Sequence, residues 1–172
     1  MSDLLDTLVQ ELCIDPGRVY ATGFSNGAFM VSRLGCELSD RVAAIAPVGG
    51  VDHPAGACGG PVPVLAVHGT GDPVVPLPGG QVRRWNYTGA RAAMAGWAAQ
   101  NHCATSIRTT TLSRTTRWDE YPACAAETAM IVVEGGGHTW PGAPDAARPG
   151  TLSDDISAAE MIWAFFSNKA RP

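Results

Sequence analysis

The fold is decided by the stretch Val19-Tyr20-Ala21-Thr22-Gly23-Phe24-Ser25-Asn26-Gly27. Its first part is rich in β-branched and aromatic residues, which predicts a strand over residues 18–23. Its second part is a Gly-x-Ser-x-Gly sequence, which is typical of a strand that turns sharply into a helix and exposes the serine hydroxyl. We expect a glycine on each side of Ser25 because the reversal leaves little room for side chains. The sequence therefore predicts a nucleophilic serine in front of a helix over 26–38.

The start of that helix also predicts a site for a developing negative charge. The first backbone N–H groups of a helix have no acceptor within the helix, and the helix dipole is positive at that end. The residue after the serine, Asn26, begins the helix in this interpretation. We therefore predict that the N–H of Asn26 is an oxyanion donor.

A second segment predicts the acid. The strand expected over 63–68 is apolar up to its last residue, His68, and is followed by Gly69-Thr70-Gly71-Asp72-Pro73. Continuous apolar runs of this length are typical of buried parallel strands, so Asp72 is expected on a turn beyond the carboxyl end of such a strand. An aspartate in a turn more often only shapes the turn, and the catalytic interpretation depends on the other segments. Asp52, which follows a strand expected over 42–48, is the alternative acid.

A third segment predicts the base. The apolar strand expected over 129–134 is followed by three glycines and then by His138. A lone histidine is more often structural, but a glycine-rich loop after a strand suits a general base that moves against a serine. The order Ser25, Asp72, His138 is the order of nucleophile, acid and base in α/β-hydrolases. We predict that His138 takes the proton of Ser25 and that Asp72 orients its imidazole.

Together the three segments resemble the polyhydroxybutyrate depolymerase and feruloyl esterase family, from about Leu5 to Phe166. The resemblance implies the α/β-hydrolase fold, secretion, and hydrolysis of feruloyl, acetyl or short polyhydroxyalkanoate esters by Ser25, Asp72 and His138. Members of that family carry a longer N-terminal region, with a His-Gly-Gly-like loop that supplies a second oxyanion N–H. We therefore expect this chain to match the C-terminal two-thirds of such a domain. A non-catalytic or weakly active fragment is the competing hypothesis, and a peptidase of the same fold is a further alternative.

Aromatic residues near the predicted triad are candidates for substrate binding. Phe24 precedes the serine and Trp140 follows the histidine by two positions, so both are predicted to form an apolar wall for the acyl or aryl group. Trp85 is a weaker candidate, and large aromatic residues are more often simply core. His53 is either at the mouth of the site or on the surface. His68 and His102 are expected to be structural.

Length and composition predict one globular domain over residues 1–172, because 45% hydrophobic residues in a chain of this length suffice for a full core. The resemblance implies that this is an α/β-hydrolase domain. Alternating strands and helices predict a mostly parallel sheet with helices on both faces. The helices are expected over about 4–12, 83–100 and 153–168, and residues 107–118 are expected to form an exposed strand.

The net charge of −4 argues against nucleic acid or an anionic membrane as a partner. No run of 18 apolar residues and no signal peptide is visible. We expect no metal and no organic cofactor.

The cysteines and one strand edge give two further expectations. The pairs Cys36–Cys58 and Cys103–Cys124 are positioned to form disulfides, with Cys13 left over, although free buried cysteines are an equal alternative. Without the family's N-terminal strands, the strand before Ser25 is expected to lie at an edge of the sheet. Such an edge predicts self-association, most simply a two-fold dimer.

Overall fold

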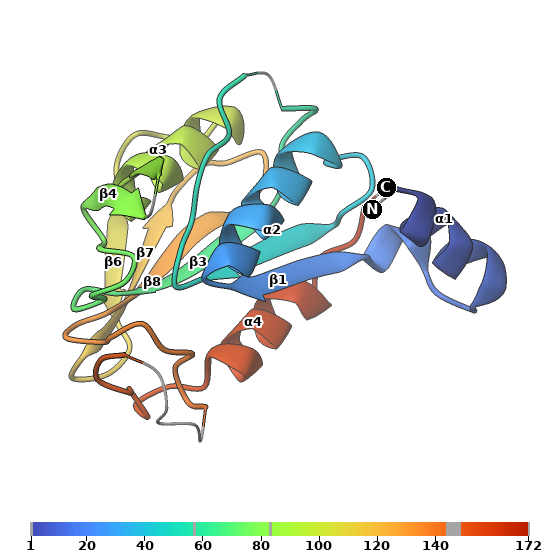
Figure 1. The fold of residues 1–172 in the computed structure, drawn as a ribbon. Coiled ribbons are helices and arrows are strands. Elements are labelled where there is room, and N and C mark those ends of the chain that lie inside the picture. The colour runs from blue at the N-terminus through green and yellow to red at the C-terminus, as the bar shows by residue number, and fades with distance from the viewer. Residues whose placement is uncertain (1, 57, 83, 144–148, 172) are drawn as a thin grey trace.

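The computed structural model describes residues 2–56, 58–82, 84–143 and 149–171. Its main element is a six-stranded sheet in the order β1-β2-β3-β8-β7-β6 (Figure 1). The neighbours from β1 to β8 are parallel, and β7 and β6 continue the sheet with antiparallel pairing. The strands are β1 (Tyr20–Phe24), β2 (Ala44–Val48), β3 (Val64–Gly69), β6 (Arg108–Thr111), β7 (Thr116–Tyr121) and β8 (Thr128–Val133). The predicted mostly parallel sheet is confirmed.

Helices cover both faces of this sheet. Figure 1 shows α2 (Asn26–Glu37) and α3 (Ala90–Gln100) on one face and α4 (Ala158–Ser167) on the other. The strand β3 shows why: Val64 and Ala66 join the core beneath α2 and α3, whereas Leu65 and Val67 join the core above α4. Successive side chains of a strand point to opposite faces, so a strand covered on both sides must be apolar throughout.

The N-terminal helix α1 (Ser2–Glu11) forms as predicted but contributes no buried residue. It projects from the body of the molecule (Figure 1), where Arg41 holds it through an ion pair to Asp6 at 2.7 Å. A short 3₁₀ turn, η1 (Pro16–Arg18), leads from it to β1. As expected, β1 lies at an edge of the sheet.

Two expected elements are wrong. The helix expected from about residue 83 begins only at Ala90, and a two-stranded hairpin of β4 (Gly79–Val82) and β5 (Trp85–Thr88) precedes it; residue 83 itself lies outside the described part. Aromatic and β-branched residues favour the strand over 85–88, and the alanine-rich helical pattern starts only after Gly89.

The single exposed strand expected over 107–118 is a hairpin of β6 and β7. Its turn contains no glycine, proline or asparagine. Instead, the hydroxyl of Ser113 accepts hydrogen bonds from the backbone N–H groups of Thr115 and Thr116 and closes the turn. The strand β7 is only partly exposed, since Thr116 and Asp119 are buried and its other residues are of intermediate burial.

Both predicted disulfides are present, Cys36–Cys58 and Cys103–Cys124, and Cys13 is a free, exposed thiol. The first joins the end of α2 to the loop between β2 and β3. The second joins the loop after α3 to the loop between β7 and β8. No helix in the described part of the chain is long and apolar enough to cross a membrane.

Candidate active site

Ser25 occupies the turn between β1 and α2 in a strained backbone conformation, with φ 57° and ψ −118°. Its own N–H is held by the carbonyl of Val48 at 2.9 Å, which fixes the turn against β2. Gly23 is a steric requirement, because a Cβ there would lie 2.5 Å from the carbonyl oxygen of Gly27. A Cβ at Gly27 would meet nothing within 4 Å, so the expectation that both glycines avoid side-chain clashes is wrong for Gly27.

Asn26 is the first residue of α2. Its backbone N–H therefore belongs to the first turn of the helix, where N–H groups have no acceptor within the helix. This N–H directly follows Ser25 in the chain, and the prediction that it is an oxyanion donor stays a prediction.

Asp72 lies in the loop after β3 and is almost completely buried. Its Oδ1 accepts the backbone N–H groups of Val74 and Val75, both at 2.8 Å. Its Oδ2 lies 2.8 Å from Nδ1 of His138. Burial alone would raise the pKa of Asp72, but the hydrogen bonds from His138, Val75 and Val74 outweigh it and hold the pKa below its ordinary value. The carboxyl group is therefore ionised at neutral pH.

His138 connects the acid to the serine. Its Nε2 lies 2.9 Å from Oγ of Ser25, and only 5% of the residue is exposed. With Asp72 ionised, Nδ1 keeps the proton and donates a hydrogen bond to Oδ2. Nε2 is then unprotonated and can accept a hydrogen bond from the serine hydroxyl. The ring of Phe24 packs against the imidazole, with 4.7 Å between the ring centres. The structure thus brings Ser25, Asp72 and His138 together in one hydrogen-bonded row.

The loops that carry Asp72 and His138 leave the sheet side by side. The strands before them, β3 and β8, are paired in register from Val64 and Thr128 to Gly69 and Val133. The carboxyl ends of parallel strands meet at one edge of a sheet, which is where ligands of open α/β sheets bind.

The two loops are also bonded to each other. The N–H of Gly71 donates to the carbonyl of Gly136 at 2.9 Å, and the hydroxyl of Thr70 accepts from the N–H of Gly135 at 2.8 Å. A Cβ at Gly69 would collide with the carbonyl of Gly136. Gly69 therefore permits the close approach of the two loops, and the glycine-rich segment before His138 is held against the segment that carries Asp72.

The alternative acid, Asp52, is held elsewhere. Its backbone N–H donates to Ser32 of α2 at 3.2 Å, and its carbonyl accepts from the indole of Trp97 on α3 at 2.8 Å. Its carboxylate lies 3.5 Å from the hydroxyl of Thr88 on β5. The carboxylate that contacts His138 is that of Asp72.

The remaining predicted residues lie at different distances from this row. Trp140 is half-buried and packs against the core on the α4 side, whereas Trp85 is 74% exposed on β5. His53 packs edge-on against Trp97 and bonds to Gln100 on α3, and His102 is exposed.

The sequence analysis did not single out Tyr87, and it expected only a structural role for His68. Tyr87 of β5 packs edge-on against Phe29 of α2, with 5.7 Å between the ring centres, and its hydroxyl donates to the carbonyl of Pro76 at 3.2 Å. Burial and the negative charge of Asp72 raise the pKa of the phenol. The hairpin therefore borders the loop that carries the acid, a position that no local pattern indicates. His68 lies against Asp72 itself.

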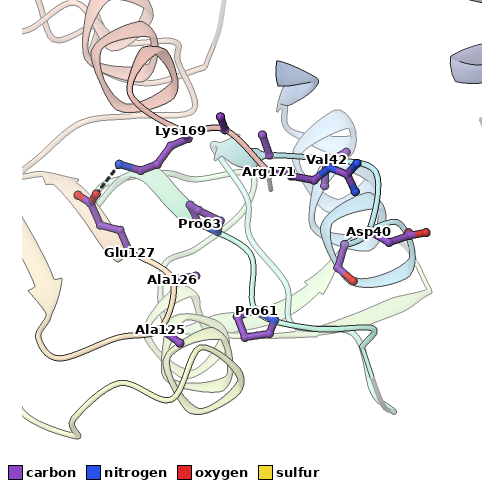
Figure 2. A pocket seen from close by; sticks show the side chains of 12 residues that line it. Asp40, Val42, Pro61, Pro63, Ala125, Ala126, Glu127, Lys169 and Arg171 are labelled. Carbon is purple, nitrogen blue, oxygen red and sulfur yellow. Dashed lines mark hydrogen bonds and ion pairs between the residues drawn. The ribbon is translucent and has the colours of Figure 1, made fainter. Parts of the chain in front are cut away.

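A pocket of about 560 Å³ lies at the other end of the parallel strands (Figure 2). It is lined by residues just before β2, β3 and β8 and by the chain after α4, where Lys169 pairs with Glu127 at 2.7 Å. The candidate active site is at the carboxyl ends of these strands, so this pocket is not its cleft. Among the described residues, no group of three or more His, Cys, Asp or Glu side chains is placed to hold a metal ion.

Known proteins resemble this chain in sequence. Feruloyl esterase D from Neurospora crassa is 32% identical over 96% of this chain and 53% of its own length. Feruloyl esterase C from Emericella nidulans is 35% identical over 95% of this chain and 54% of its own length. Feruloyl esterase B from Piromyces equi is 30% identical over 79% of this chain and 27% of its own length. The chain thus spans about half or less of the length of these relatives. No family model matches the sequence.

Solved structures resemble the chain in fold. An acetyl xylan esterase from Aspergillus awamori superimposes with a TM-score of 0.61 at 13% identity, over 96% of this chain and 65% of that one. A thermostable esterase superimposes with a TM-score of 0.58 at 16% identity, over 99% of this chain and 36% of that one. The chain therefore has the α/β-hydrolase fold and is a homologue of the feruloyl esterases.

Proposed function

We propose that this chain is the part of a serine carboxylesterase that carries the nucleophile, the acid and the base. One observation carries the proposal: Nε2 of His138 lies 2.9 Å from Oγ of Ser25, and Nδ1 of His138 lies 2.8 Å from Oδ2 of Asp72. A serine hydroxyl needs an adjacent base to become a nucleophile, and the base needs a third group to fix its tautomer. The likeness to proteins named feruloyl esterase supports the reaction class.

In this mechanism, His138 removes the proton of Ser25 while Oγ attacks the ester carbonyl. The carbonyl oxygen becomes an oxyanion beside the N-terminus of α2, where it accepts the N–H of Asn26. The imidazolium of His138, stabilised by Asp72, then gives its proton to the leaving alcohol, and an acyl group remains on Ser25. Water activated by His138 hydrolyses this acyl-enzyme and restores the serine.

The oxyanion step sets the main condition on the rate. Loss of one donor from an oxyanion hole costs about 2.7–4 kcal/mol of transition-state stabilisation. Among the residues that the structure describes, we assign Asn26 and no second donor. A non-catalytic or weakly active fragment is therefore the alternative to be tested.

The substrate class follows from the relatives and from the aromatic side chains. Feruloyl esters, acetyl esters and short polyhydroxyalkanoate esters all fit a site in which Phe24 and Trp140 form an apolar wall beside His138. Phe24 packs on the imidazole itself, and Trp140 follows it by two residues. Neither a metal nor an organic cofactor takes part in this mechanism.

We also propose that the protein is secreted. Two disulfides, Cys36–Cys58 and Cys103–Cys124, join its loops. Disulfides form and persist in oxidising compartments and are rare in the cytosol.

The test is intact-mass analysis after incubation with a fluorophosphonate, followed by peptide mapping. This probe reacts with an activated serine and requires no guess about the natural ester. We expect one adduct, on Ser25, that is absent from Ser25→Ala and from heat-denatured protein. Folded protein that stays unlabelled would contradict the proposal and favour the non-catalytic fragment.

A further inference from the structure

His68 is a buried histidine that the proposed reaction does not use. It lies near the end of β3 and is 2% exposed. Its Nε2 lies 2.8 Å from the carbonyl oxygen of Val75 and 3.7 Å from Oδ2 of Asp72. Its Nδ1 is buried and has no hydrogen-bond partner among the described residues. Because a carbonyl only accepts, Nε2 must carry the proton, and Nδ1 is the bare nitrogen.

This arrangement holds His68 in its neutral form. A proton on Nδ1 would place a charged donor without a partner in the interior. Burial lowers the pKa of His68, and the Val75 carbonyl and the charge of Asp72 offset only part of that effect, while His138 adds to it. The titratable groups around it are Asp72 of the loop that follows β3, His138 of the neighbouring loop and, beyond Asp72, Tyr87 of the hairpin. The pKa of Asp72 is lowered, so this carboxyl group is ionised at neutral pH.

Val75 connects His68 to the acid. Its carbonyl accepts from His68, and its N–H donates to Oδ1 of Asp72 at 2.8 Å. The residue is 3% exposed, so the carbonyl would be a buried acceptor without a donor if the imidazole were absent. A change at His68 is therefore transmitted through one backbone unit to the carboxylate.

We propose that His68 is a positioning residue for the acid: its neutral imidazole anchors Val75, so that Oδ1 of Asp72 stays bonded to backbone N–H groups and Oδ2 alone faces His138. The role rests on the proposed function, because it concerns the acid of the same triad. In this role His68 is a fourth side chain that supports the reaction, beside Ser25, His138 and Asp72, and it touches neither the substrate nor the serine. The donor at Nε2 carries the effect, so a side chain that supplies an N–H at the same reach should replace it.

The experiment compares three substitutions at this position. His68→Gln keeps an N–H donor at about the reach of Nε2, His68→Asn carries the same amide one methylene shorter, and His68→Phe keeps a ring without a donor. His53→Phe is the matched control, because His53 also bonds through Nε2, to Gln100 at 2.9 Å, but away from the triad. Two readouts are taken: the downfield proton resonance of the His138 Nδ1–H, and kcat and KM on a small aryl acetate.

In His68→Asn and His68→Phe we expect a broadened or lost resonance and a fall in kcat of about tenfold to a hundredfold with KM unchanged, since small misplacements of reacting groups cost this much. His68→Gln and His53→Phe should keep the resonance and most of kcat. A donor-deficient variant that retains both the resonance and kcat would overturn the proposal. Wild-type protein that shows the resonance but no turnover would instead contradict the proposed function, and the resonance alone would then decide the role of His68.

Discussion

Gly23 packs directly against the backbone of Gly27: a Cβ on Gly23 would lie 2.5 Å from the carbonyl oxygen of Gly27 and 3.1 Å from Cγ2 of Val31. The same construction at Gly27 meets nothing within 4 Å. The two glycines around Ser25 thus have different structural roles. Gly23 is needed because β1 passes close to the first turn of α2. Gly27 contributes only the backbone atoms that Gly23 approaches.

This difference predicts opposite results for two similar substitutions. Gly23→Ala should destabilise the fold by about 1–3 kcal/mol or more, because neither backbone can yield. Gly27→Ala should change stability by less than about 1 kcal/mol, since alanine is the better helix former. The free energy of unfolding in urea measures both. Equal losses would show that the close approach of the two backbones is not what requires Gly23.

The acid can be identified by a pair of isosteric substitutions. Asp72→Asn should lower kcat about 10⁴-fold while leaving the fold intact, because an amide favours the wrong tautomer of His138. Asp52→Asn should leave kcat nearly unchanged, since Asp52 bonds to α2, α3 and β5. Steady-state kinetics on a small ester is the measurement. A slow Asp52→Asn enzyme combined with a normal Asp72→Asn enzyme would transfer the role to Asp52.

Burial of His68 predicts how stability changes with pH. Its folded-state pKa is lowered from 6.5, so below about pH 6.5 the unfolded chain binds a proton at this residue that the folded chain does not bind. As the pH falls toward the folded-state pKa, His68 should lower the free energy of unfolding by up to about 1.4 kcal/mol per pH unit.

Urea denaturation between pH 7 and pH 5 measures this slope. His68→Gln should have a flatter profile than the wild type. His102→Asn, a change at an exposed histidine with φ 55° that asparagine tolerates, should keep the wild-type slope. A His68→Gln protein with the full wild-type slope would be inconsistent with a neutral, buried His68.

The disulfides predict a thiol count. Unreduced native protein should take up one alkyl group, on Cys13, and reduced, unfolded protein should take up five. Each disulfide closes a loop of just over 20 residues, with separations of 22 and 21, which corresponds to about 3 kcal/mol of stability in the chain-entropy model. Replacing Cys36 and Cys58 by alanine should therefore lower the melting temperature, and mass spectrometry with thermal denaturation tests both statements.

We also propose that the chain forms a two-fold dimer. The edge of β1 carries no further strand in the described structure, and the neighbouring helix α1 exposes Leu4 by 51%. Leu12, which is 54% exposed, belongs to the segment directly after α1, which ends at Glu11. Unpaired strand edges readily take up a second chain. Light scattering at micromolar concentration should give twice the chain mass of 17.9 kDa, and the double change Leu4→Lys, Leu12→Lys should lower it. A monomeric mass for the unmodified chain would contradict this proposal.

The parts of the fold that sequence predicted are those in which a local pattern has a single structural solution. The stretch around Ser25, the apolar strands before Asp72 and His138, and their order along the chain predicted the positions that the structure brings together. The two hairpins were not predicted. The turn between β6 and β7 depends on the hydroxyl of Ser113, and serine is too common to mark a turn by itself.

The surroundings of the site could not be predicted for a different reason. The contact of His68 with Val75 forms because the loop from Gly69 to Val75 folds back over the end of its own strand. The contact of Phe29 with Tyr87 joins two elements far apart in the chain. Neither contact follows from the periodicity of a single segment, because each depends on how separate segments pack.

Because β1 lies at the edge of the sheet, Ser25 is supported differently from Asp72 and His138. Asp72 and His138 follow two neighbouring inner strands and are bonded to each other through their loops, whereas Ser25 follows the outermost strand. Proteins open locally, and margins open at lower free energy than interiors. Fraying of β1 would carry the serine away from an acid–base pair that stays assembled. We therefore expect mild heat or denaturant to separate Ser25 from His138, and so to abolish activity, before the core unfolds.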